Sequence, residues 1–312
     1  MKKLLLVDAN SLIHRSFHAL PPFTGPKGEP TGAIYGVASI LLKLWREERP
    51  DYAAALFDRP EPTFRDKMYA EYKAQRPPAP DALISQIIEA HKLFSAFGIP
   101  TFEVPGFEAD DLIATFAEHF KKENDVQIVI LTGDRDTLQL VEEEKIVVRT
   151  FNKGISDTTV YDEKAVREKY GLAPTQLIDY KALVGDPSDN VKGVPGVGPK
   201  TATELLQKFG SVKDVYARLA SDSTLGSKLN THKKDMELSE KLVTLERHVP
   251  MQAPALESLA TKKEPPDART YFAAMKFATL LARLGGTETP TALTAARTAK
   301  RTRGNQGTIF DI

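Results

Sequence analysis

Three short runs of aliphatic residues in the first half of the chain each end at or near an aspartate. They are KLLLVD, which ends at Asp8, YAAALFD, which ends at Asp58, and VQIVILTGD, which reaches Asp134. We interpret these runs as β-strands. Because ligands bind outside the carboxyl ends of strands in open α/β sheets, we expect the three aspartates to converge on a functional edge.

Between these runs, apolar residues recur at the three- and four-residue spacing of an amphipathic helix. The segments with this pattern are 32–48, 80–98 and 109–123. Strands that alternate with helices of this length predict βαβ units. We therefore predict an α/β fold over residues 1–160, with a doubly wound and largely parallel sheet.

The pattern changes near residue 160. Over 161–285, helical segments are separated by short Gly/Pro stretches, and one last helix is expected over 267–285. Residues 286–312 are rich in Thr and Ala and contain several Lys and Arg residues. We predict that these last residues form a disordered basic tail.

Composition excludes several classes of site. The 312 residues include 42 basic and 42 acidic ones and no cysteine, which rules out disulfides, thiolate zinc sites and a cysteine nucleophile. No run approaches the ~18–20 apolar residues of a membrane span. The LLLV stretch before Asp8 is shorter than the ~7–15 apolar residues of a signal peptide, so we expect a cytoplasmic protein.

Nine carboxylates stand at predicted strand ends or beside glycines. They are Asp8, Asp58, Glu108, Asp110, Asp111, Asp134, Asp136, Asp186 and Asp189. Oxygen-rich sites without histidine favour Mg²⁺ or Mn²⁺ over Zn²⁺, and two such ions suit hydrolysis of a phosphodiester. Each acid alone could cap a helix or a turn, but caps do not explain their shared location on one sheet edge.

Two further segments suit nucleic acid. In FRDKMYAEYKAQRPPAPD (64–81), cations alternate with tyrosines, which fits a single strand through phosphate neutralisation and base stacking, although a solvated linker would look similar. In GVPGVGPKTA (193–202), glycines lead through Pro199 into a helix, so that backbone N–H groups can face a phosphate without reading bases. A plain helix–helix turn is the alternative, and the spacing is not that of a nucleotide-binding P-loop.

These segments together resemble a known family. The motifs LLLVDANSLIHRSFHAL, GAIYGVASILLKL, LFDRPEPTFRDKMYAEYKAQRP, VPGFEADDLIAT, LTGDRDTLQL and LVGDPSDNVKGVPGVGPKTA occur in the order found in the 5′ nuclease (5′→3′ exonuclease, flap endonuclease) domain of bacterial DNA polymerase I. His14 and Lys192 depart from the family pattern. Because no proofreading or polymerase domain follows, we expect a free-standing nuclease with a PIN-like core.

The resemblance implies a role for each matched residue. Asp8, Asp58, Glu108 and Asp110 would hold a first metal ion, and Asp111, Asp134, Asp136 and Asp189 would hold or orient a second, with Asp186 in support. Lys73 and Arg65 would contact the scissile phosphate from a helical arch at about 65–95, where Tyr72 and Arg76 would also face DNA. A helix–hairpin–helix with Gly193, Gly196, Gly198, Lys200 and Thr201 would hold the duplex and bind a K⁺ ion.

The C-terminal NQGTIFDI interrupts the low-complexity tail with apolar residues. The QGTIF stretch, with Gln306, Ile309 and Phe310, resembles the peptide by which bacterial proteins bind the DNA sliding clamp. Short apolar anchors on a flexible tether suit a peptide-in-groove interaction, although so short a motif also arises by chance.

The sequence as a whole predicts a monomeric, divalent-metal-dependent 5′→3′ exonuclease and 5′-flap endonuclease. Its substrates would be DNA with 5′ flaps, 5′ ends or nicks, in repair and in primer removal. Two alternatives remain open. One is a DNA-junction-binding protein without activity, and the other is a related metal-dependent ribonuclease.

Overall fold

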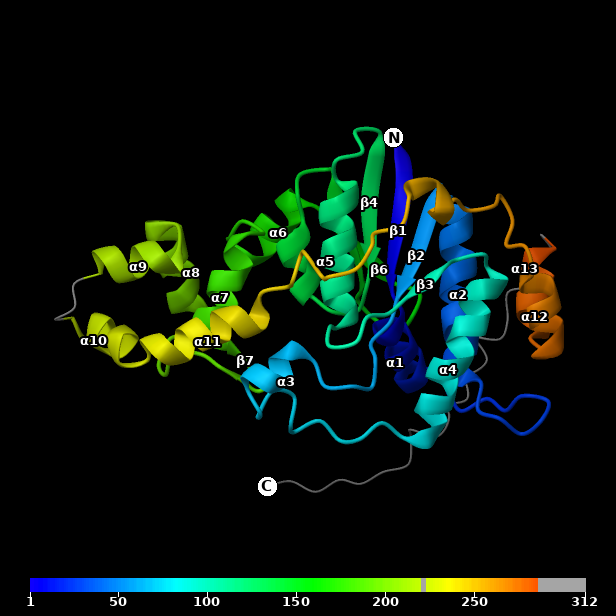
Figure 1. The fold of residues 1–312 in the computed structure, drawn as a ribbon, viewed down its shortest axis with the longest axis horizontal. Helices are drawn as coiled ribbons and strands as arrows, with labels where there is room; N and C mark the ends of the chain where they lie inside the picture. The colour runs from blue at the N-terminus through cyan, green and yellow to red at the C-terminus, as the bar shows by residue number, and fades with distance from the viewer. Residues whose placement is uncertain (220–222, 286–312) are drawn as a thin grey trace, which may run out of the picture.

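The computed structural model describes residues 1–219 and 223–285. Its centre is a six-stranded sheet in the order β3-β2-β1-β4-β5-β6, and only the β5–β6 pair is antiparallel. The strands are β1 (Lys2–Asp8), β2 (Tyr52–Leu56), β3 (Thr101–Phe102), β4 (Val126–Leu131), β5 (Ile146–Phe151) and β6 (Thr158–Tyr161). The predicted α/β fold with a largely parallel sheet is therefore confirmed (Figure 1).

Helices cover both faces of this sheet, as alternate residues of β1 show. Leu4 and Leu6 are fully buried in one apolar cluster with α5 (Ala109–Phe120). Leu5 and Val7 point to the other face, where α1 (Ala9–Ala19), α2 (Gly32–Glu47) and α4 (Asp81–Ala96) pack. Because successive side chains of a strand point to opposite faces, a strand buried on both sides is apolar throughout. The predicted helices over 32–48, 80–98 and 109–123 correspond to α2, α4 and α5.

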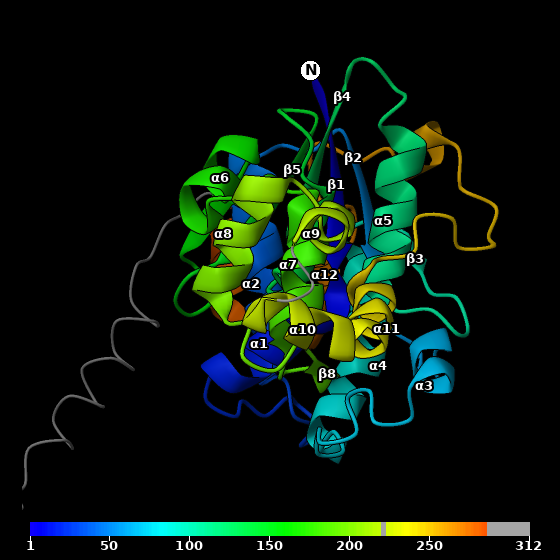
Figure 2. The same cartoon turned by 90° about the vertical axis from the view of Figure 1, so that its left-hand side faces the viewer.

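A lobe of short helices lies beside the α5 face of the sheet (Figure 2). Its elements are α6 (Glu163–Tyr170), α7 (Gln176–Val184), α8 (Pro199–Phe209), α9 (Val212–Arg218), α10 (Thr224–Thr231) and α11 (Lys233–Val243). Between α7 and α8, β7 (Gly185–Asp186) and β8 (Val191–Lys192) form a small antiparallel pair. Leu206 and Val215 belong to the same apolar cluster as α5, so the lobe shares a core with the sheet.

The predicted single helix over 267–285 is wrong. It is divided into α12 (Ala268–Ala274) and α13 (Ala278–Leu284), because Lys276 has a left-handed backbone conformation with φ +56°. Phe272 and Phe277 on either side of the break are both buried in the cluster of α1, α2 and α4. These helices therefore pack on the α/β core, away from the lobe over 161–243 with which the sequence had grouped them (Figure 1).

The segment expected to form a helical arch at about 65–95 is helical only at its two ends. The short helix α3 (Phe64–Met68) is followed by turns to Arg76, and α4 begins at Asp81. Pro77, Pro78 and Pro80 lie between them, and proline both disfavours a helical residue before it and lacks the N–H donor that a helix interior needs. The connection therefore crosses the carboxyl edge of the sheet as non-helical chain (Figure 1).

Within the described ranges, no helix is long and apolar enough to cross a membrane. Residues 286–312, which include the predicted clamp-binding residues Gln306, Ile309 and Phe310, lie outside the described part of the chain.

Candidate active site

The carboxylates of Asp8 and Asp58 lie at the ends of neighbouring parallel strands. Asp8 ends β1 and caps α1, since its Oδ1 accepts from the Ser11 N–H at 2.9 Å. Its Oδ2 accepts from the Thr132 hydroxyl at 2.6 Å, which links β1 to the end of β4. Asp58 follows β2, and its Oδ1 accepts from the Ala109 N–H at 2.7 Å. Helix α5 therefore begins at the same sheet edge.

The first turn of α5 brings three further acids to this edge. Glu108 is the N-cap, and Asp111 closes a capping box by accepting from the Glu108 N–H at 3.1 Å. Asp110 lies between them, and its Oδ1 is buried without a hydrogen-bond partner. Capping therefore accounts for Asp111 but leaves an oxygen of Asp110 unsatisfied.

Arg65 and Asp111 lie elsewhere than the resemblance implied. The Arg65 guanidinium binds both oxygens of Asp111, with Nη1–Oδ2 at 2.7 Å and Nη2–Oδ1 at 2.8 Å. Arg65 is 1% exposed and Asp111 is fully buried. Arg65 also donates to the carbonyls of Leu242 and Thr244. In this arrangement Arg65 fastens α3 to α5 and α11, with its Nη1 also 3.4 Å from Glu108 Oε2, and the two oxygens of Asp111 are taken up by the guanidinium. This pairing differs from the phosphate contact and the metal ligation that the resemblance implied for the two residues.

Asp134 and Asp136 lie in the turn that follows β4. Asp136 begins a 3₁₀ helix, η1 (Asp136–Leu140), and its N–H donates to Asp134 Oδ1 at 2.9 Å. The ammonium group of Lys181, from α7, bridges the carboxylates of Asp136 and Asp186, with Lys181 Nζ 2.7 Å from Asp186 Oδ2. Lys181 was not among the residues predicted from the sequence. Its only sequence signal is a lysine five residues before Asp186 at the end of an apolar helix.

Burial, followed by mutual repulsion, raises the pKa of several of these acids. Burial, followed by the charge of Asp58, raises the pKa of Asp8 from its usual 3.8 to about 7. Burial and the charge of Asp134 raise the pKa of Asp136 to about 7, against the opposing effect of Lys181. Burial and the charges of Asp8 and Asp134 raise the pKa of Asp110 well above its usual range. These acids therefore lie close enough to raise one another's pKa, and the cluster lacks sufficient positive charge.

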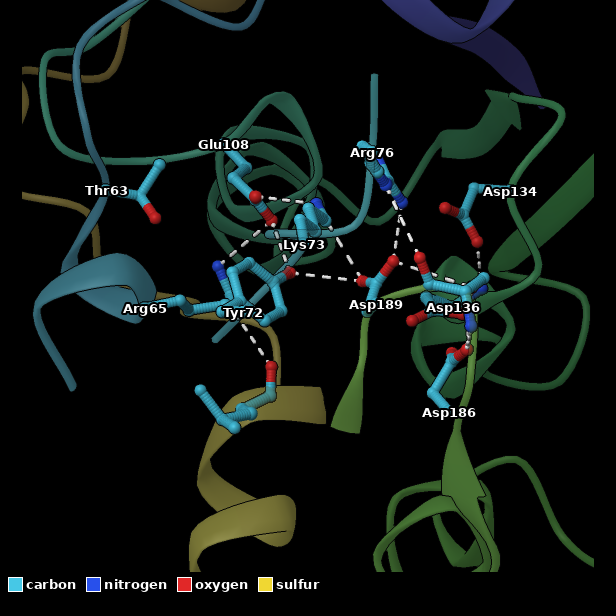
Figure 3. A network of polar contacts seen from close by, with 12 residues as sticks. Thr63, Arg65, Tyr72, Lys73, Arg76, Glu108, Asp134, Asp136, Asp186 and Asp189 are labelled. Atoms are coloured by element: carbon cyan, nitrogen blue, oxygen red, sulfur yellow. Dashed lines mark hydrogen bonds and ion pairs between the residues drawn. The ribbon is translucent and has the colours of Figure 1, made fainter. Parts of the chain in front are cut away.

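Three side chains from the turns after α3 point into the acidic edge (Figure 3). Lys73 Nζ lies 2.6 Å from Glu108 Oε1, and Arg76 Nη2 lies 2.5 Å from Asp189 Oδ1. The Tyr72 hydroxyl lies 3.2 Å from Glu108 Oε2 and 3.1 Å from Asp189 Oδ2. Burial would lower the pKa of Lys73, but Glu108 and Asp189 outweigh it and keep the pKa above its usual value.

The segment between α7 and α8 has the geometry of a helix–hairpin–helix. Gly196 has φ +83°, and α8 begins with Gly198 as N-cap and Pro199 in its first turn, without a side-chain cap. The N–H groups at the start of α8 therefore remain available to an acceptor. Lys200 is highly exposed. The ammonium of Lys228, from α10, lies 3.0 Å from the position that a Cβ on Gly196 would occupy. A second lysine, which was not predicted from the sequence, therefore lies beside the hairpin.

Comparisons with known proteins agree with this arrangement. The model of the 5′–3′ exonuclease N-terminal, resolvase-like domain matches residues 3–171, and that of the 5′–3′ exonuclease C-terminal SAM fold matches residues 172–267. The chain belongs to the 5′–3′ exonuclease family. The 5′–3′ exonuclease of Aquifex aeolicus is 44% identical over 245 residues, which are 78% of this chain and 82% of that protein.

Other members of the exonuclease family are longer. DNA polymerase I of Caldicellulosiruptor bescii is 41% identical over 292 residues, which are 92% of this chain but only 34% of the polymerase. The chain thus spans about a third of the length of that relative. Among solved structures, T5 5′-exonuclease with bound zinc ions superposes with a TM-score of 0.63 at 26% identity, over 79% of this chain and 91% of that one.

The carboxylate oxygens at this edge are the donors that a hard cation prefers. Within residues 1–219 and 223–285, no three acidic or histidine side chains already stand close enough to hold a metal ion. Several of the carboxylates instead face Lys73, Arg76 and Lys181. The unsatisfied oxygen of Asp110 and the raised pKa values of Asp8 and Asp136 show that the edge would be stabilised by added positive charge.

Proposed function

We propose that this chain is a divalent-metal-dependent nuclease that hydrolyses phosphodiester bonds in DNA at 5′ ends and 5′ flaps. The observation that carries the proposal is the acidic edge itself, where buried carboxylates at the ends of β1 and β4 and at the start of α5 repel one another. A structural role needs no such concentration of like charge. Perturbed titratable groups that gather at one site are typical of active sites.

Eight of the nine predicted carboxylates would serve this chemistry. Asp8, Asp58, Glu108 and Asp110 would hold one ion, and Asp134, Asp136 and Asp189 would hold a second, with Asp186 in support. Bound Mg²⁺ or Mn²⁺ would lower the pKa of a water molecule and stabilise charge on the phosphate oxygens. Asp111 is excluded from this set because Arg65 occupies both of its oxygens.

Lys73 and Arg76 would meet the phosphates that enter the site. A cation beside the reacting phosphate neutralises the charge that develops there. Lys73 also holds Glu108, so that one ammonium group would serve the carboxylate in the free protein and the phosphate in the complex. Tyr72 is 5% exposed and packs on Val191 and Val243. It would therefore position its neighbour Lys73 rather than stack on a base, which differs from its expected role in DNA contact.

The hairpin before α8 would hold the duplex portion of the substrate. The residues that would contact the DNA backbone lie in this hairpin and the first turn of α8, where uncapped N–H groups are suited to a phosphate. They are Gly193, Gly196, Gly198, Lys200 and Thr201. Carbonyl oxygens of the same hairpin would bind a K⁺ ion. A grip of this kind acts on the DNA backbone and therefore favours structure over base sequence.

A 5′-flap DNA labelled at either end tests the proposal. Mg²⁺ or Mn²⁺ should release short fragments from the 5′ side, chelation by EDTA should abolish them, and product mapping should place the cut near the flap junction. Binding without cleavage at any divalent ion would instead support the junction-binding alternative. Preferential cleavage of the matched RNA strand would support the ribonuclease alternative.

Removal of flaps and primers in replication and repair would place the protein in the cytoplasm, where it would act as a monomer. Gln306, Ile309 and Phe310 would add a contact to the bacterial sliding clamp. Clamp pull-down of the full chain, compared with a chain ending at Gly304, should show binding of the full chain only.

A further inference from the structure

The turns after α3 are fastened to the loop between β7 and β8 by contacts that involve the backbone. We call residues 69–76 the latch segment and residues 186–190 the aspartate turn. The Lys73 N–H donates to the Asp189 carbonyl at 3.0 Å, and the Asn190 side-chain amide donates to the Glu71 carbonyl at 2.8 Å. Gln75 Nε2 donates to the carbonyls of Pro187 at 3.2 Å and Ser188 at 3.0 Å.

Two residues in this contact adopt a costly backbone conformation. Lys73 has φ +52° and Asn190 has φ +57°, in the left-handed region that non-glycine residues rarely enter. Asparagine tolerates this region better than most residues, and lysine does not share that preference. The Lys73 conformation is therefore imposed by its surroundings, namely the bonds on either side of it, and it directs the Lys73 side chain to Glu108 and Asp189 (Figure 3).

The aspartate turn is also joined to the hairpin before α8, through strand pairing and close backbone packing. Gly185 pairs with Lys192 and Asp186 pairs with Val191, which closes the base of the turn. The backbones of Gly185 and Gly193 approach so closely that a Cβ on Gly185 would lie 2.4 Å from the Gly193 nitrogen. A short, tightly packed path thus runs from the hairpin through the turn to the latch segment.

We propose that Asn190 and Gln75 are positioning residues that hold Lys73 over the acidic edge and fix its position relative to the hairpin. A substrate gripped by the hairpin would thereby meet Lys73 at a set distance along its backbone. This inference rests on the proposed function, because it assigns the means by which the same site is aligned. Misalignment by about 1 Å in such a site can cost on the order of a hundredfold in rate.

Three variants each remove one side-chain donor between the latch segment and the aspartate turn, and they leave the nine carboxylates unchanged. Asn190→Asp is isosteric and tolerates the left-handed backbone but cannot donate to Glu71. Asn190→Gly keeps the backbone conformation and also loses the donor, and Gln75→Glu removes the donor on the other side. The matched control is Gln127→Glu, because Gln127 donates to the Glu144 carbonyl at the same 2.8 Å near the opposite sheet edge.

Steady-state cleavage of the 5′-flap DNA gives the first readout. We expect each latch variant to lose about tenfold or more in kcat with KM within about twofold of the parent, since positioning acts on the reacting groups more than on binding. The control should retain its kcat. An Asn190→Gly variant with parental kcat would overturn the inference, because the donor would then be unnecessary.

Limited digestion with trypsin in EDTA, without DNA, gives a second readout that does not depend on activity. Release of the latch segment should speed cleavage after Lys73 several-fold in the three variants and not in the control, whereas Arg76 is no site for trypsin because Pro77 follows it. Unchanged digestion of all three variants would refute the latch even if kcat fell. Faster digestion together with an inactive parent enzyme would refute the proposed function while leaving the latch intact.

Discussion

Arg65 and Asp111 form a buried ion pair in which two parallel hydrogen bonds join a guanidinium to a carboxylate, at 2.7 and 2.8 Å. The pair fastens the short helix α3 to the start of α5, and Arg65 also contacts the backbone carbonyls of Leu242 and Thr244 and, at 3.4 Å, Glu108 Oε2. The opposite charge of Asp111 therefore compensates for the burial of the Arg65 guanidinium.

Breaking this pair should destabilise the protein. We expect Arg65→Met to lower the free energy of unfolding by about 3–5 kcal/mol, because it leaves Asp111 buried and unpaired. Urea denaturation followed by circular dichroism measures the change. Arg167→Met removes an exposed ion pair with Glu163, one turn earlier in the same helix, and should lower the free energy of unfolding by only about 0.3–0.5 kcal/mol. A fully stable Arg65→Met protein with impaired DNA cleavage would restore the role in phosphate contact.

Neutralising one acid of the edge should separate binding from cleavage. Asp134→Asn should bind flap DNA as the parent does and lose Mg²⁺-dependent cleavage, while the upward shift in melting temperature on adding Mg²⁺ should shrink. Binding by fluorescence anisotropy and melting by differential scanning fluorimetry measure these quantities. Asp125→Asn, at the opposite end of β4, is the control and should change none of them. Full cleavage by Asp134→Asn would contradict the assignment of the edge.

The metal-free protein should become less stable as the pH rises through the acidic range. The folded-state pKa values of Asp8 and Asp136 are raised to about 7 from a usual 3.8, so the folded state binds protons that the unfolded state has released. Stability from this source is lost between about pH 4 and about pH 7. Urea titrations in EDTA across this window should show the decline, and Asp110→Asn should make it shallower. A rise in stability over the same window would exclude the proposed repulsion.

Replacing Lys73 should affect turnover more than affinity. Lys73→Ala removes the ammonium that contacts Glu108 and lies beside Asp189, so we expect kcat to fall by about a hundredfold or more while the Kd for flap DNA changes by only a few-fold. Single-turnover kinetics and anisotropy provide the two numbers. Lys122→Ala, an exposed lysine beyond α5, is the control. Equal losses in rate and affinity would show that Lys73 contributes to DNA binding alone.

The two lysines beside the hairpin should each contribute one phosphate contact. Lys200→Ala and Lys228→Ala should each weaken duplex binding uniformly across sequences and reduce the slope of log K against log salt by about 0.9. Anisotropy at several salt concentrations tests both, again with Lys122→Ala as the control. An unchanged slope in Lys228→Ala would show that its proximity to Gly196 serves packing alone.

The convergence of acids was predictable because it follows from strand direction. Asp8, Asp58 and Asp134 each come after an apolar run, and parallel pairing of β1 with β2 and β4 places all three at one edge. The break between α12 and α13 was not predictable in this way, since Phe272 and Phe277 keep an apolar pattern on both sides of it. Periodicity reports which residues are buried, and it does not report a single left-handed residue such as Lys276.

The sequence by itself determined the α/β class and the sheet edge at which the acids gather, because local periodicity and strand polarity are properties of short segments. Only the tertiary structure decided which cation each acid meets. Asp111 is paired with Arg65, while Asp136 and Asp186 share Lys181. Arg65 is distant from Asp111 in the sequence, and Lys181 is distant from Asp136. Spacing along the chain could not distinguish a carboxylate that is paired with a buried cation from one that lacks such a partner, because burial and charge pairing arise only when distant segments pack.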